Sequence, residues 1–235
     1  MVEFVERPAE GRAVRASRQV RLSDAGPDGH LRVDGLARYL QDVATDDWAS
    51  SGIESDDTWV VRRTAWRRRP DVAWPRLYDE VSLTTWCAGT GVAWAERRTD
   101  VELAGVVVAR AASLWVPVGP EGRPRRVRAE FLDVYGPAAR GRRVPGRIAP
   151  SPLAPDAALR PWVLRRSDVD VVGHVNNAAV WFAVAEIAPM DVSGVTLTHH
   201  GSLEADDEVV LGVRGSRFWL VVGDEVRVSG EFEVD

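Results

Sequence analysis

Short segments in which apolar and polar residues alternate dominate the chain, and this pattern predicts strands with one buried face. The clearest case is EVRVSGEFEV at residues 225–234, where the valines and the phenylalanine alternate with mainly polar neighbours. Gly223 and Asp224 precede it at the position of a hairpin turn. We predict further strands at residues 59–67, 79–86, 93–101 and 106–116 in the first half of the chain, and at 195–200, 208–213 and 217–222 in the second.

Two segments have the periodicity of a helix instead. In the first, Leu36, Leu40 and Val43 recur at spacings of four and three residues, so they share one helical face. The second, residues 178–185, is apolar on all sides, as expected of a helix enclosed by protein, and Pro189 ends it. A single helix among antiparallel strands is buried only where the sheet curls around it. The pattern therefore predicts an α+β fold.

The two halves of the chain contain the same motif. Residues 23–31, SDAGPDGHL, align without gaps with residues 167–175, SDVDVVGHV, at an offset of 144 positions. Each copy follows an extended, basic segment and leads into a predicted helix. The repeat indicates that one structural unit occurs twice.

Residues 120–155 separate the two units and differ from them in composition. The stretch is rich in arginine, and its prolines are Pro120, Pro124, Pro137, Pro145, Pro150, Pro152 and Pro155. Because proline interrupts helices and sheet ladders, we predict a long linker. The predicted organisation is an N-terminal unit at 1–119, the linker at 120–155 and a C-terminal unit at 156–235.

Composition argues against several classes of protein. The 235 residues carry a net charge of −5, which disfavours non-specific binding of nucleic acid. No stretch of roughly 18 residues is apolar and free of charge, so we expect no membrane span. Residues 1–12 lack the apolar region of a secretory signal. The single cysteine, Cys87, cannot form an internal disulfide, and we therefore expect a cytoplasmic protein.

Several residues with reactive side chains are predicted to be structural. All 30 basic residues are arginine, which excludes catalysis by lysine. His199 and His200 are neighbours in a predicted strand and so point to opposite faces, which argues against a shared metal ion. Cys87 lies in a predicted strand and is expected to be a packed core thiol. We predict no metal site.

The second copy of the loop contains the pattern Asp-x-Asp-x-x-Gly-His-x-Asn-Asn at residues 168–177. With a strand before it, an apolar helix after it and an antiparallel sheet, this resembles the hotdog fold of thioesterases. Two such units in one chain resemble the acyl-acyl carrier protein (acyl-ACP) thioesterases of plants and bacteria over about residues 14–235. Other similar segments are residues 38–44, 59–63, 78–81 and 86–91. The resemblance implies a double hotdog, with two antiparallel sheets each wrapped around a central helix.

The resemblance also implies an activity. We expect a hydrolase that cleaves acyl-ACP into free fatty acid and carrier protein in fatty acid biosynthesis, without a metal or organic cofactor. Carrier protein is strongly acidic, so Arg67, Arg68, Arg69 and the linker arginines are candidates for its docking site or for binding a phosphate. Three alternatives stay open: an acyl-coenzyme A thioesterase, a hotdog dehydratase, and an acyl-binding protein without catalysis. Chain length, saturation and the choice between monomer and homodimer are also open.

Matched by position, the catalytic aspartate of the family falls on Asp170 and its histidine on His174. A carboxylate at this place could orient and deprotonate water, or attack the thioester directly. Backbone amides around Gly173 could bind the developing oxyanion. Asn176 and Asn177 would hold the turn, the water or the substrate.

Two positions depart from the family pattern. Val172 stands where the family usually has asparagine, and the further carboxylate of the family falls on Ser202. A shift of two residues offers Glu204 instead, so all three positions are candidate substrate contacts. These departures motivate the alternative of a binding protein.

The first copy of the loop lacks the catalytic aspartate, because Gly26 stands at that position. We therefore expect chemistry only in the C-terminal unit, while the N-terminal unit shapes a tunnel for the acyl chain. Candidates for the wall of this tunnel are Trp48, Trp59, Trp66, Trp86 and Trp94.

Overall fold

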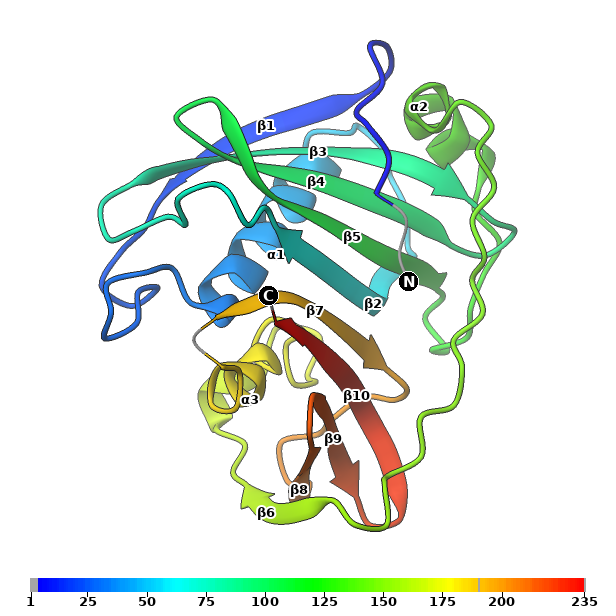
Figure 1. Cartoon of the computed structure of the whole chain (residues 1–235). Coiled ribbons are helices and arrows are strands. Elements are labelled where there is room, and N and C mark those ends of the chain that lie inside the picture. The colour runs from blue at the N-terminus through cyan, green and yellow to red at the C-terminus, as the bar shows by residue number, and fades with distance from the viewer. Residues whose placement is uncertain (1–3, 190, 235) are drawn as a thin grey trace.

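The computed structural model describes residues 4–189 and 191–234 of the chain. In these ranges, ten strands form one antiparallel sheet that curves around helices, so the predicted α+β class is confirmed (Figure 1). The elements in chain order are β1 (Ala13–Gln19), α1 (Val33–Ala49), β2 (Thr58–Arg68), β3 (Glu80–Thr90), β4 (Ala95–Leu103), β5 (Val106–Val118), α2 (Ala129–Ala139), β6 (Ala158–Trp162), α3 (Trp181–Ala185), β7 (Val192–His199), β8 (Val209–Arg214), β9 (Arg217–Val222) and β10 (Glu225–Val234). Within the described ranges, no helix is long and apolar enough to cross a membrane.

The N-terminal half places α1 against one face of the strands β1-β3-β4-β5-β2 (Figure 1). Leu36, Leu40 and Val43 of α1 are buried, as their spacing predicts. They belong to the main core together with Leu83 of β3 and Val101 of β4. Burial of this apolar face, rather than helix propensity alone, stabilises the helix.

The C-terminal half repeats this arrangement with the strands β7-β10-β9-β8-β6. Its helix is shorter than predicted, because α3 covers only Trp181–Ala185. The amide oxygen of Asn176 accepts a hydrogen bond from the backbone N–H of Ala178 at 2.8 Å. This local bond accompanies a turn in the residues before α3, where the apolar pattern predicts the first turn of the helix.

The two halves meet at the pair β2–β7, where Arg63 lies opposite Thr198 and Arg67 lies opposite Gly194. The two predicted sheets are therefore joined edge to edge into one. Helices α1 and α3 also contact each other. Buried residues of both halves form one hydrophobic core as a result.

The predicted linker contains a helix, α2, which the proline-rich sequence did not predict. Phe131 and Tyr135 of α2 are buried, and the Phe131 ring stacks on Trp59 with centroids 4.7 Å apart. Pro137 lies within the helix near its C-terminal end. The helix also packs against β3, so this part of the linker belongs to the N-terminal half. The exact unit boundaries stay a prediction.

Candidate active site

The second copy of the loop lies between a short 3-10 turn, Arg166–Asp168, and α3. The N–H of Asp170 donates to the carbonyl of His174 at 3.0 Å, and the N–H of Gly173 donates back to the carbonyl of Asp170 at 3.0 Å. Gly173 has φ of +90°, in the left-handed region that favours glycine. The loop is thus a closed turn, in which backbone bonds hold the residues that carry the predicted chemistry.

The Asp170 carboxylate is fixed by two hydrogen bonds. Its Oδ2 accepts from the side-chain amide of Asn176 at 3.1 Å, and its Oδ1 accepts from the backbone N–H of Val172 at 2.9 Å. Asn176 therefore orients the carboxylate, while Val172 contributes its backbone and leaves its side chain largely exposed.

His174 has a carboxylate partner, and it is Glu204. The Nδ1 of His174 lies 2.8 Å from Oε2 of Glu204, and Ser202 Oγ donates to Oε1 of the same carboxylate at 2.9 Å. The hydrogen bond from His174 contributes most to lowering the pKa of Glu204 below its usual range. Both candidates for the further carboxylate position thus lie at the site, with Ser202 orienting Glu204.

The backbone amides around Gly173 are not equivalent. The Gly173 N–H is already engaged with the carbonyl of Asp170. In the described part of the chain, the N–H of His174 has no acceptor, whereas the corresponding N–H of His30 donates to the Asp28 carboxylate at 3.0 Å. Val172 stands at the position of Asp28, and its apolar side chain leaves the amide of His174 free for a ligand.

Two neighbouring cavities lead from the loop along α1. A small one of about 30 Å³ is lined by Asn177 and Trp181, among others. The next, of about 270 Å³, is lined mainly by apolar and aromatic side chains and shares Arg97 and Trp115 with the first. We call these two cavities the channel. Its position suits an acyl chain that extends from the loop beneath α1.

Two tryptophans of the predicted tunnel wall lie at the channel. Trp48 and Trp59 line the larger cavity, whereas Trp66, Trp86 and Trp94 line neither cavity of the channel. Phe131 of α2 also lines the larger cavity, and sequence analysis missed it because the prolines suggested a linker. The spacing of Phe131, Tyr135 and Ala138 is the helical signal that could have revealed it.

The chain matches the model of a known protein family. A model of the acyl-ACP thioesterase N-terminal domain matches residues 11–135, more than half of the chain. The chain belongs to the acyl-ACP thioesterase family. This family consists of thioester hydrolases, and the match includes α1, the first copy of the loop and every residue that lines the larger cavity.

Relatives support the same assignment. An uncharacterized protein of Mycobacterium tuberculosis is 27% identical over 96% of this chain and 94% of its own. Oleoyl-acyl carrier protein thioesterase 2 of Arabidopsis thaliana is 25% identical, and the match covers 81% of this chain and 59% of that protein.

Solved structures confirm the double hotdog fold. The 12:0-ACP thioesterase from Umbellularia californica superposes with a TM-score of 0.80 at 22% identity, over 97% of this chain and 99% of that chain. An acyl-ACP thioesterase from Bacteroides thetaiotaomicron gives a TM-score of 0.77 at 16% identity, over 95% and 98% of the two chains.

In this member of the acyl-ACP thioesterase family, two residues with other possible chemistry are buried. Burial raises the pKa of the Cys87 thiol to about 11 and, with nearby Arg62 and His200, lowers the pKa of His199 to about 4. Near neutral pH the thiol is therefore protonated and the imidazole uncharged. No group of three or more histidine, cysteine or acidic side chains that could hold a metal occurs in the residues that the structure describes.

Several arginines proposed to dock carrier protein have intramolecular partners. Arg67 forms an ion pair with Glu233 at 2.6 Å, and Arg142 forms one with Glu96 at 2.6 Å. Arg128 pairs with Asp57 at 2.9 Å. Their charge is partly neutralised within the chain, so docking of carrier protein by these residues stays a prediction.

Proposed function

We propose that this protein hydrolyses thioesters of acyl carrier protein and releases the free fatty acid. The observation that carries the proposal is the arrangement of Asp170, held by Asn176, and His174, held by Glu204, on one loop beside the channel. Family membership supports thioester hydrolysis, and the names of the relatives support carrier protein as the thiol.

The geometry supports separate roles for the two held groups. Asp170 accepts a proton from water as the water oxygen attacks the thioester carbonyl carbon. The oxyanion that forms can accept a hydrogen bond from the free N–H of His174. As the carbon–sulfur bond breaks, the His174 imidazolium donates its Nε2 proton to the leaving thiolate. Glu204 stabilises that cation through Nδ1, and solvent then restores both protonation states.

The channel supports an acyl chain as the other half of the substrate. Asn177 lines the small cavity next to the loop, and Trp48, Trp59 and Phe131 line the larger one. These three rings pack against one another, so they restrict the space available to a chain.

The test is release of thiol from acyl-ACP and acyl-coenzyme A over a ladder of chain lengths, with wild type beside Asp170→Asn. This substitution keeps the size and removes the charge, so kcat/KM should fall at least 100-fold, about 3 kcal/mol of transition-state stabilisation. Asp168→Asn is the matched control, because among the described residues the Asp168 carboxylate accepts one hydrogen bond, from the backbone N–H of Arg165 at 2.8 Å. It should leave kcat/KM within about threefold.

Each other outcome contradicts a defined part of the proposal. Faster turnover of coenzyme A esters than of carrier protein esters would show that coenzyme A, and not carrier protein, is the preferred thiol of the substrate. Equal activity of wild type and Asp170→Asn would remove Asp170 from the chemistry. If wild type binds acyl thioesters but releases no thiol from any of them, the protein is an acyl-binding protein and not a hydrolase.

A further inference from the structure

A third cavity, of about 530 Å³, lies beside the first copy of the loop and shares no lining residue with the channel. Its apolar wall includes Trp66 and Trp74, whose rings stack with centroids 5.7 Å apart. Leu31 and Val72 extend this wall, and Ala185 contributes from the end of α3. We call it the first-loop cavity. An aliphatic chain fits such a wall, because it can exchange water for apolar contacts.

Three arginines line the same cavity, and two of them, Arg68 and Arg76, carry the argument. In the described ranges of the chain, neither forms an ion pair with a carboxylate. The guanidinium carbon of Arg68 lies 5.7 Å from the centre of the Trp74 ring, so this cation is held against the apolar wall. A guanidinium group in such a position binds carboxylates well, because its fork of N–H donors matches their two oxygens.

Two buried donors in the wall lack acceptors. The Nε of Arg68 and the indole Nε1 of Trp66 are both buried without a hydrogen-bond partner among the described residues. Buried donors are almost always satisfied in folded proteins, and a lone unsatisfied N–H is unfavourable. Both belong to residues that line the cavity, but neither nitrogen atom is exposed to it, so the terminal nitrogens of Arg68 are the donors available to a ligand.

The other charged groups of the wall are already paired. The Nδ1 of His30 lies 3.0 Å from the Asp28 carboxylate, and Arg32 forms an ion pair with Asp34 at 2.7 Å. Asp28 is the one carboxylate among the residues that line the cavity, so Arg68 and Arg76 leave this lining net positive.

The repeat shows how this charge differs from that of the candidate active site. The N–H of Arg76 donates to Asp79 Oδ2 at 2.8 Å, just as the N–H of Glu204 donates to Asp207 Oδ2 at 2.7 Å. Arg76 thus occupies the place of Glu204, and Gly26 occupies the place of the catalytic aspartate. At the second loop, the carboxylates of Asp170 and Glu204 would repel an anion. At the first loop, Arg76 would attract one.

We propose that the first-loop cavity binds the carboxylate of a straight-chain fatty acid, with Arg68 and Arg76 on the carboxylate and the chain against Trp66 and Trp74. The cavity has no equivalent of Asp170, so we describe it as a binding site and not as a second site of thioester hydrolysis. If the proposed reaction is correct, this ligand is also the product, and the cavity gives the enzyme a second place to hold it.

The experiment is isothermal titration of the full chain with decanoate, below its micelle concentration, in the absence of any thioester. Variants are Arg76→Gln and Arg68→Gln, with Arg123→Gln as the matched control, since Arg123 is exposed and lines none of the three cavities. We expect decanoate to bind, each cavity variant to weaken one binding event about tenfold, and the control to match wild type. Arg76→Lys should recover part of the loss, because it restores the charge.

Two further ligands test the chemistry. Decyltrimethylammonium has the chain with the opposite charge, and acetate has the carboxylate without the chain; neither should bind at this site. No decanoate binding, equal binding by the cavity variants and wild type, or equal binding of the ammonium compound would each overturn the proposal. Because no thioester is used, an inactive enzyme leaves this result valid, and failure to bind decanoate leaves the hydrolase proposal intact.

Discussion

The first and second copies of the loop follow the same backbone path with different side chains. In the first, the N–H of Gly26 donates to the carbonyl of His30 at 2.8 Å. The same bond, 144 positions later, joins Asp170 to His174 at 3.0 Å. A glycine with positive φ occupies the same place in each turn. The turn therefore forms with either glycine or aspartate at its first position, and that position is free to change chemistry.

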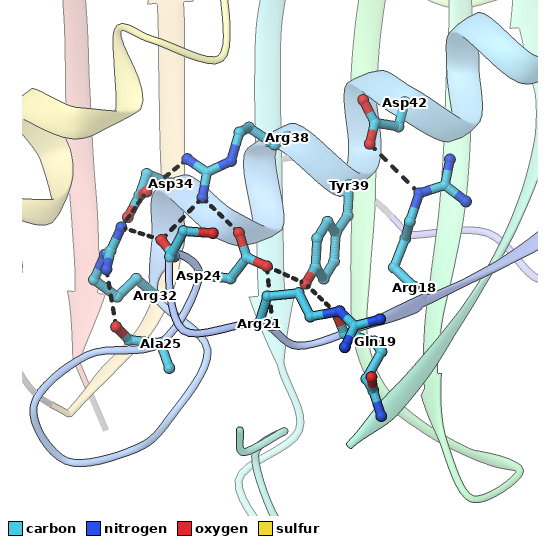
Figure 2. A network of polar contacts seen from close by, with 11 residues as sticks. Arg18, Gln19, Arg21, Asp24, Ala25, Arg32, Asp34, Arg38, Tyr39 and Asp42 are labelled. Carbon is cyan, nitrogen blue, oxygen red and sulfur yellow. Dashed lines mark hydrogen bonds and ion pairs between the residues drawn. The ribbon is translucent and has the colours of Figure 1, made fainter. Parts of the chain in front are cut away.

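Side chains hold the first copy in place through a polar network (Figure 2). Arg32 donates to the Asp34 carboxylate at 2.7 Å and to the carbonyl of Ala25 at 2.9 Å. Asp24 accepts from the hydroxyl of Tyr39 at 2.8 Å, and Asp34 is fully buried. Through Asp24 and Arg32, the loop is attached to Asp34, Arg38 and Tyr39 of α1.

The second copy has no counterpart of this attachment. Asn176 stands at the position of Arg32, and Ala178 stands at the position of Asp34. The polar groups of the second loop contact one another instead, and the side chains of His174 and Glu204 are about half exposed. One backbone thus serves as a structural anchor where its charged side chains are paired and buried, and as the proposed reactive site where they are partly exposed.

The largest expected effect is on stability and concerns the anchor. Asp34→Asn leaves Arg32 and Arg38 without their buried carboxylate and should lower the free energy of unfolding by about 3 kcal/mol. The value lies at the low end for a broken buried pair, because the two arginines are 32% and 31% exposed and can partly reach water. Urea unfolding followed by circular dichroism measures it.

The control for the anchor is Asp42→Asn. Asp42 is 50% exposed and pairs with Arg18 at 3.4 Å, so its loss should cost less than about 1 kcal/mol. Equal destabilisation by both variants would show that burial of the network does not matter.

The next effect is on activity and concerns the two carboxylate–histidine pairs. Glu204→Gln removes the charge that holds His174, and kcat should fall about 10- to 100-fold with little change in KM. Asp28→Asn makes the corresponding change beside His30 and should leave kcat unchanged. Steady-state kinetics on both variants decide the matter; a comparable loss in Asp28→Asn would mean that the first copy takes part in turnover.

A smaller effect distinguishes backbone strain from chemistry. Gly29 and Gly173 have φ of +77° and +90°, and a Cβ added to either would meet no atom within 4 Å. Changing each to alanine should therefore cost the same strain, about 1 kcal/mol in unfolding experiments. Only Gly173→Ala should also lower kcat/KM, about tenfold, because its Cβ would lie where the thioester approaches the loop. Unequal stability losses would contradict the shared backbone path.

Sequence patterns predicted the parts of this comparison that depend on local order. The offset of the two loops and the spacing of Leu36, Leu40 and Val43 predicted the repeat and α1, because both follow from neighbours in the chain. Helix α2 escaped prediction because proline usually interrupts a helix. Pro137 lies in the last turn of α2, so it removes one backbone hydrogen bond just before the helix ends at Ala139.

Pairing between distant segments was harder to predict. Alignment could not decide whether Ser202 or Glu204 takes the further carboxylate position of the family. The folded structure shows that Glu204 contacts His174 and that Ser202 donates to the same Glu204 carboxylate. The burial of Asp34 and the unpaired state of Arg76 likewise depend on which segments meet, and local periodicity does not contain that information.

The smallest effect is a difference in how the two loops lower the pKa of a carboxylate. The pKa of Glu204 is lowered mainly by the side chain of His174, whereas the pKa of Asp28 is lowered mainly by the backbone N–H of His30. His174→Ala should therefore raise the pKa of Glu204 toward its ordinary value, while His30→Ala should leave most of the lowering at Asp28. Carbon-13 titration of the two carboxyl groups measures both shifts.

The sign of the linked stability follows from the same shifts. A carboxyl group with a lowered pKa stabilises the fold above its ordinary pKa of about 4, and this contribution is lost as the pH falls through the lowered value. The Glu204 side chain is 47% exposed, so its contribution is small. His174→Ala should remove it at neutral pH and leave stability unchanged at pH values below the lowered pKa of Glu204. An equal rise of both pKa values in the two alanine variants would contradict the backbone origin of the Asp28 shift.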